Sequence, residues 1–124
     1  MISYENRTIE RRRKGYNMFV YNKEVERVNC DEGVFRKILA YNEDMMMCEI
    51  EFKKGAVGSR HAHPHLQTTY IIRGSFEFTI GDETKTVKAG DSLLMPPDVP
   101  HGTVALEDGM LVDVFSPMRE DFLK

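Results

Sequence analysis

The residues of this chain that are best suited to chemistry are its histidines, three of which stand at alternate positions in one short stretch. His61, His63 and His65 occur in the sequence HAHPHLQ, and Gln67 continues the same spacing. If this stretch is a β-strand, alternation places all four side chains on one face. Imidazole nitrogens that converge in this way can bind a single metal ion. The remaining histidine, His101, lies in the proline-rich sequence PPDVPHG, which we interpret as a loop.

A second unusual group is a single carboxylate within an apolar run near the C-terminus. Asp113 interrupts the sequence MLVDVF and shares its alternation with Leu111 and Phe115. A carboxylate that faces a protein interior is costly unless it is paired, hydrogen-bonded or near a cation. Asp113 therefore either lines a metal cavity as a proton-transfer group, with Phe115 as an apolar wall, or lies at a bulge or strand edge and faces water. Arg119 follows in the tail, where its planar guanidinium could hold a substrate carboxylate, although a lone tail arginine is usually a surface charge.

The elements that must position these groups are predicted to be short β-strands. Apolar and polar residues alternate over several short runs, no long segment repeats every 3.6 residues, and Asp108-Gly109 is a strong hairpin signal. We expect an all-β sandwich or barrel, with at most a short helical turn near residues 118–122. The expected strands are 34–41, 45–52, 76–80, 84–88, 92–95, 103–106 and 110–115, in addition to the histidine stretch.

Size and composition predict a single domain with a core of its own. The chain has 124 residues and a net charge of −3, which gives no sign of nucleic acid or an anionic membrane as a partner. The first residues, MISYENRTIE, contain no apolar signal sequence, and no run is long enough to span a bilayer, so we expect a soluble, cytoplasmic protein. Cys30 and Cys48 are expected to be free thiols, with Cys48 in the core.

The N-terminal part of the chain differs from the rest. We divide the chain into an extension of residues 1–30 and a single barrel of residues 31–124. The basic run at residues 11–14 is interpreted as a solvated lead-in. Residues 16–28 form a β-prone arm that could add a strand to the domain or to a neighbouring subunit. Because exposed strand edges need cover, we expect a homodimer.

Two motifs make this sequence resemble the cupin superfamily. The first motif combines spaced glycines with His-x-His and an acidic or amide residue, and the second combines glycine, proline and histidine. The match covers residues from about 34 to 116 and implies a double-stranded β-helix of the jelly-roll type. Asp98 is a departure, since it stands where the second motif usually has glycine. The matching residues are Gly55, His61, His63, Gln67 and Gly74 in the first motif, and Gly90, Pro96 and His101 in the second.

The cupin resemblance implies a metal site made of His61, His63, Gln67 and His101. Such a ligand set suits one divalent transition metal (Ni, Zn, Mn, Fe or Co) and leaves one or two positions for water or substrate. A glutamate is commoner where this chain has Gln67. Four neutral ligands would leave the charge of the ion uncompensated, which favours an anionic substrate. His65 follows Pro64, so it either contacts the ligands or substrate or is an incidental loop histidine.

Within the cupins, the sequences HAHPHLQ, PPDVPHG and LVDVFSPMREDFL resemble the pectin-degradation cupins of the unsaturated pyranuronate lyase type. That resemblance implies an enzyme that converts 4,5-unsaturated uronates from pectin or alginate into linear keto acids. Asp113, Phe115 and Arg119 match the active-site aspartate, phenylalanine and arginine of those enzymes. We expect Arg119 to hold the sugar carboxylate and Asp113 to transfer a proton during ketonisation. Two alternatives remain: another cupin enzyme, such as a sugar isomerase or dioxygenase, and a non-catalytic module that binds a sugar acid or a metal.

Overall fold

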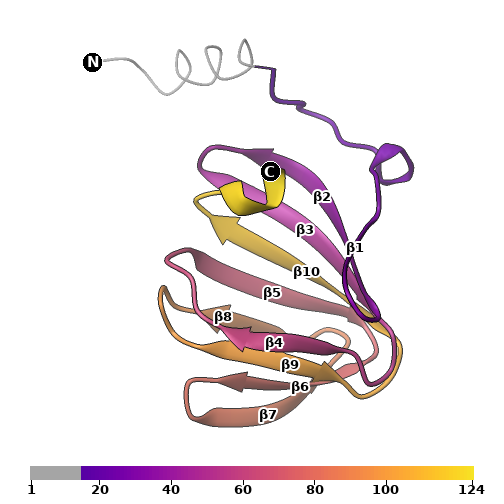
Figure 1. Ribbon diagram of the computed structural model, residues 1–124, viewed down its shortest axis with the longest axis vertical. Coiled ribbons are helices and arrows are strands. Elements are labelled where there is room, and N and C mark those ends of the chain that lie inside the picture. The colour runs from indigo at the N-terminus through magenta and orange to yellow at the C-terminus, as the bar shows by residue number, and fades with distance from the viewer. Residues whose placement is uncertain (1–14) are drawn as a thin grey trace.

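Two antiparallel β-sheets make up the chain, as Figure 1 shows for the computed structural model, which describes residues 15–124. The first sheet has the order β1-β2-β3-β10-β5-β8 and the second has the order β4-β9-β6-β7. The prediction of an all-β fold is confirmed. The elements are η1 (Asn22–Glu24), β1 (Val28–Asp31), β2 (Val34–Asn42), β3 (Met45–Phe52), β4 (Val57–His61), β5 (Leu66–Arg73), β6 (Ser75–Ile80), β7 (Glu83–Lys88), β8 (Ser92–Met95), β9 (His101–Ala105), β10 (Gly109–Ser116) and η2 (Glu120–Leu123), where η marks a 3-10 turn.

Strand alternation determines which side chains enter the core between the sheets. In β3, Met46 and Cys48 are fully buried, whereas Met47 between them is 39% exposed on the outer face. The same alternation places Leu111 and Phe115 of β10 in the core. The core position predicted for Cys48 is confirmed, and both cysteines are free thiols. Burial of these apolar side chains, each contributing roughly 1.5–3 kcal/mol, is the main force that holds the two sheets together.

Local turn chemistry fixes the connections. Between β2 and β3, the side-chain oxygen of Asn42 accepts hydrogen bonds from the backbone N–H groups of Asp44 and Met45, at 2.9 and 3.2 Å. Between β5 and β6, Gly74 has a φ of +80°, and a Cβ atom there would lie 2.6 Å from the carbonyl oxygen of Asp108. Only glycine fits that position, which explains the second glycine of the first cupin motif.

The histidine stretch is not one strand, so that prediction is wrong. His61 ends β4 in the second sheet, whereas Gln67 lies in β5 of the first sheet, and residues 62–65 cross between them. Pro64 lacks a backbone N–H and restricts the residue before it, so a continuous ladder cannot form here. The crossing segment is held to the loop before β9, because the N–H of Asp98 donates to the carbonyl of His63 at 2.8 Å.

That loop also explains the departure at Asp98. Its φ is 65°, a left-handed conformation that glycine adopts freely and that aspartate tolerates better than most residues. The position therefore keeps the backbone shape that the motif glycine provides. His101, expected within the loop, is instead the first residue of β9 and pairs with His61 of β4. The pairing of these two strands brings the two histidines side by side.

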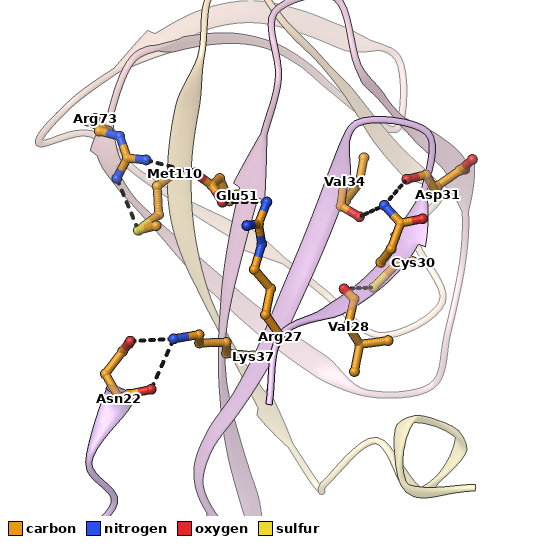
Figure 2. A network of polar contacts seen from close by, with 11 residues as sticks. Asn22, Arg27, Val28, Cys30, Asp31, Val34, Lys37, Glu51, Arg73 and Met110 are labelled. Carbon is orange, nitrogen blue, oxygen red and sulfur yellow. Dashed lines mark hydrogen bonds and ion pairs between the residues drawn. The ribbon is translucent and has the colours of Figure 1, made fainter. Parts of the chain in front are cut away.

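Most of the expected N-terminal arm forms no strand: residues 16–27 contain only the 3-10 turn η1, and β1 begins at Val28. β1 pairs with β2, with Val28 opposite Arg36, so the first sheet includes residues on both sides of the boundary expected at residue 30. Farther upstream, Lys37 donates to the side-chain and backbone oxygens of Asn22 (Figure 2) at 2.8 and 3.0 Å. The basic run of residues 11–14 lies outside the described residues. Across residues 15–124, no helix has the length and apolar character needed to cross a bilayer.

Candidate active site

Three histidines converge where the two sheets meet. His61 ends β4, His63 lies in the crossing segment and His101 begins β9. Each offers a ring nitrogen, and these atoms all lie within 4.8 Å of one another. His63 and His101 are buried, whereas His61 is exposed, so the cluster is enclosed on one side and reachable from the other. Since imidazole binds first-row metals at about 2.1 Å, small side-chain shifts would let all three share one ion.

Backbone carbonyls orient the three rings in the same way. Each Nδ1 lies within hydrogen-bonding distance of a carbonyl oxygen two residues away, at 2.7 Å for His61, 3.1 Å for His63 and 3.0 Å for His101. A neutral imidazole that donates from Nδ1 keeps its lone pair on Nε2. Burial lowers the pKa of both His63 and His101, which favours this neutral form. The rings are therefore held as electron-pair donors, as metal ligands must be.

Gln67 completes a donor set that fits a divalent metal. Both ring nitrogens of His63 face acceptor oxygens: Nδ1 lies 3.1 Å from the carbonyl of His65, and Nε2 lies 2.9 Å from Gln67 Oε1. A neutral imidazole has only one N–H, so if Nδ1 carries it, as in the arrangement described above, two lone pairs face each other between Nε2 and Oε1. His101 Nε2 is buried and has no hydrogen-bond partner within residues 15–124. Unpaired buried acceptors are costly, and a shared cation would satisfy all of them. Three imidazole nitrogens and one amide oxygen, with no thiolate, suit a first-row divalent ion.

Asp113 determines which end of the Gln67 amide faces the histidines. The Gln67 side-chain NH₂ donates to Asp113 Oδ1 at 2.9 Å, which turns Oε1 toward His63. The hydroxyl of Thr69 donates to the same carboxylate oxygen at 2.6 Å. Burial raises the pKa of Asp113 from 3.8 to about 6, although these two hydrogen bonds oppose the shift. A carboxylate therefore lies directly behind the neutral ligand.

A cavity of about 370 Å³ joins the metal-ligand candidates to the carboxylate. This volume suits one small ligand such as a single sugar ring. His63 stands behind the lining, with its ring 5.7 Å from that of Phe115. His65 does not line the cavity; its ring packs edge-on against His63 at 5.3 Å. The lining includes His61, Gln67, His101, Asp113, Phe115 and Arg119.

Arg119 reaches the cavity, but its guanidinium is already paired. It donates from Nε and from one terminal nitrogen to the two carboxylate oxygens of Asp121, at 3.0 and 2.9 Å. The hydrogen bond from Arg119 lowers the pKa of Asp121. The Arg119 guanidinium also lies against the rings of Phe115 and Phe122, at 5.1 and 4.2 Å from their centres. The bidentate grip expected for a substrate carboxylate is thus occupied by the chain itself.

Two residues of the cavity region were missed in the sequence. Thr69 shares the alternation of Gln67 and Ile71 in β5, so its inward position could have been read from the pattern. Arg36 shares the alternation of Val34 and Ile38 in β2, and a charge in such an inward row is the same signal that identified Asp113. Their roles could not be predicted, because a strand pattern shows which face of the sheet a side chain lies on but not which residues it contacts.

The fold and this histidine cluster agree with a family comparison. The model of the cupin domain matches residues 48–115, more than half of the chain. The chain therefore belongs to the cupin family, and the resemblance stated from its motifs is confirmed. It is 44% identical over 94 residues to the pectin degradation protein KdgF of Dickeya dadantii (strain 3937), a match that covers 74% of this chain and 86% of that protein.

Two solved structures are similar over nearly the whole domain. The structure of KdgF from Halomonas sp. has a TM-score of 0.82 and 37% sequence identity, and covers 86% of this chain and 98% of its own. An RmlC-like cupin from Shewanella frigidimarina NCIMB 400 has a TM-score of 0.83 and 40% identity, and covers 86% of this chain and 96% of its own. The expected jelly-roll cupin barrel is thereby confirmed.

Proposed function

We propose that this protein is a metal-dependent cupin enzyme that converts 4,5-unsaturated uronates, released from pectin or alginate, into linear keto acids. The observation that carries the proposal is one cavity that is lined by two members of a three-histidine cluster suited to a metal and by a carboxylate with a raised pKa. The similarity to a pectin degradation protein supports the substrate class. The neutral donor set and the arginines of the cavity favour an anionic ligand.

The metal would be held by His61, His63, Gln67 and His101. A divalent transition ion there (Ni, Zn, Mn, Fe or Co) would act as a Lewis acid on a substrate oxygen. The backbone carbonyls behind the three rings would keep the imidazoles aimed at the ion, and Asp113 would keep the Gln67 oxygen aimed at it. These residues would therefore act as a rigid, preorganised ligand set.

Asp113 is suited to the proton transfers of the reaction. Ring opening breaks the bond between the anomeric carbon and the ring oxygen, and Asp113 takes the proton of the anomeric hydroxyl as an aldehyde forms there. The ring oxygen keeps the bonding pair as an enolate, and Asp113 returns the proton to the neighbouring alkene carbon as the ketone forms. The net change is an isomerisation without an oxidant or reductant. Burial raises the pKa of Asp113 to about 6 in the protein without metal, which brings this carboxylate toward the range in which it can accept and release a proton near neutral pH.

Phe115 and Arg119 would shape the substrate pocket. Phe115 is 2% exposed and forms a fixed apolar wall against His63 and Phe122. Arg119 would add positive charge for the sugar acid, and a direct grip on the substrate would require it to exchange Asp121. We propose that the substrate is a small anionic sugar. We expect neither nucleic acid nor a membrane to be a partner, and we propose that the enzyme is cytoplasmic.

A second copy of the chain is the partner that best fits the outer face of the first sheet. Large apolar side chains are exposed there on β3, β5 and β8, with β10 between β3 and β5. Glu51 shares the alternation of Met45 and Met47 in β3, and it pairs with Arg27 and Arg73 in a charged row on this face (Figure 2). An apolar centre with a rim of both charges is complementary to its own copy across a two-fold axis. We therefore propose a homodimer through this face. The exposed residues are Met45, Met47, Leu66, Tyr70, Ile72 and Leu94.

The direct test is to incubate metal-loaded protein with 4,5-unsaturated galacturonate and follow the loss of its alkene absorbance. We expect the decay to be faster than in buffer, and faster than with protein treated with a chelator. No acceleration with any of the five metals would contradict the proposed reaction. Oxygen uptake during turnover would instead indicate a dioxygenase, since ring opening consumes none.

A further inference from the structure

Arg36 is a cation beside the cavity that no carboxylate of the described chain neutralises. It lies in β2 opposite Ile50 of β3, a buried residue, so its side chain points between the sheets. It lines the same cavity as His61 and Asp113. Its Nε is buried without a hydrogen-bond partner, and its guanidinium forms no ion pair with any residue between 15 and 124. A guanidinium with a buried, unpaired Nε and no counter-ion favours binding of an anion.

An aromatic ring holds the Arg36 guanidinium in place. Its central carbon lies 3.9 Å from the centre of the Phe122 ring, and Phe122 packs against the core. Contact with a ring face restrains a guanidinium, and its N–H groups, which lie in the guanidinium plane, can still donate. Two parallel N–H donors on a fixed plane match the geometry of a carboxylate. Arg36 is therefore preorganised for a planar anion.

The other charged groups of the cavity are engaged. Asp31 accepts the backbone N–H of Glu32 at 2.8 Å, and Asp113 accepts from Gln67 and Thr69. Arg119 holds Asp121 through two hydrogen bonds. A ligand carboxylate that approached Arg119 would have to displace Asp121, whereas one that approached Arg36 would displace no ion pair. Because no ion pair has to be broken, Arg36 is the better candidate to bind a ligand carboxylate.

We propose that Arg36 binds the carboxylate of the sugar acid and so determines the preference of this site for uronates over neutral sugars. The proposal rests on the proposed function for the identity of the ligand as a sugar acid. Arg36 would act in binding and orientation, while Asp113 would transfer protons. Strand β2 would thus supply a substrate contact from outside the two histidine motifs.

The test compares binding of two unreactive probes to metal-loaded protein by calorimetry. D-galacturonate carries the carboxylate but lacks the alkene, and its methyl ester lacks the charge. Arg36→Gln should weaken galacturonate binding by about 10- to 100-fold, the usual effect of losing a charge-assisted hydrogen bond, and leave ester binding within about twofold. The matched control is Arg27→Gln, because Arg27 also stacks on a ring, that of Phe35 at 3.8 Å, but pairs with Glu51 outside the cavity (Figure 2).

Three results would overturn the proposal: no binding of galacturonate to the wild type, equal binding by the wild type and Arg36→Gln, or an equal loss for acid and ester. If Arg36→Gln does not fold, Arg36→Lys decides, since it keeps the charge but not the fork. That variant should lose about three- to tenfold for the acid only, and wild-type affinity would refute the bidentate contact.

The alkene assay separates this proposal from the proposed function. If Arg36 is required for galacturonate binding but the wild type does not turn over unsaturated galacturonate, the reaction is wrong and the carboxylate contact stands. If turnover is observed and Arg36→Gln leaves KM and kcat unchanged, the reaction stands and the role of Arg36 is wrong.

Discussion

The contact between Gln67 and Asp113 predicts why a glutamate cannot simply replace the glutamine. The Gln67 NH₂ donates to Asp113 Oδ1 at 2.9 Å, so Gln67→Glu would place two carboxylates at that distance in an enclosed site. At an effective dielectric constant of about 20, two charges so close repel each other by about 6 kcal/mol. Without metal, the variant can avoid this repulsion only by keeping one proton on the pair.

The cost of keeping that proton determines how much Gln67→Glu destabilises the metal-free protein and how this destabilisation depends on pH. A glutamate with an ordinary pKa of about 4.3 holds a proton at a cost of about 3 kcal/mol at pH 6.5 and about 5 kcal/mol at pH 8. The folded variant therefore binds one more proton than its unfolded chain, so its stability falls as pH rises, by about 1.4 kcal/mol per pH unit. In the wild type, the pKa of Asp113 is about 6, and its own contribution changes little above pH 6.5.

The assay is urea unfolding of metal-free protein between pH 6.5 and 8 in the presence of a chelator. Gln67→Glu should become less stable than the wild type with the slope given above. The double variant Gln67→Glu/Asp113→Asn is the control, because it restores one amide and one carboxylate and should regain the pH dependence of the wild type. If Gln67→Glu and the wild type show the same pH dependence, the two side chains do not share this contact and the argument fails.

Three further predictions address the reaction, the metal and the assembly. Asp113→Asn should lower kcat for unsaturated galacturonate at least about 100-fold while metal content, measured by elemental analysis, stays unchanged; near-normal turnover would remove Asp113 from the mechanism. A chelator should destabilise the wild type by about 2.7 kcal/mol relative to protein with metal at 100 times Kd, and His101→Ala should show little response; an equal response in both would exclude His101 as a ligand. Leu94→Glu, on the outer face of the first sheet, should give a monomer in size-exclusion chromatography with light scattering, whereas Leu106→Glu should not; a Leu94→Glu dimer would place the interface elsewhere.

Much of the barrel could be predicted because strand alternation is a local property. The pattern of β3 and β10 shows directly which residues are buried, and Asp113 stood out because it broke an inward apolar row. The cupin resemblance implied that His61, His63 and His101 would meet, and their ring nitrogens lie within 4.8 Å of one another. The position of His65 beside His63 instead follows from the crossing segment, which sequence alternation did not describe.

The sequence by itself determined most of the strands and their inward faces, because these depend on residues that are close together in the chain, and the cupin motifs supplied the candidate ligands. Beyond those motifs, only the tertiary structure decided which side chains meet, because that depends on the register between distant strands. Asp113 of β10 lies opposite Thr69 of β5, and this register places its carboxylate behind Gln67. In the same way, the packing of the C-terminal turn on β2 brings Phe122 onto Arg36 and leaves that guanidinium facing the cavity.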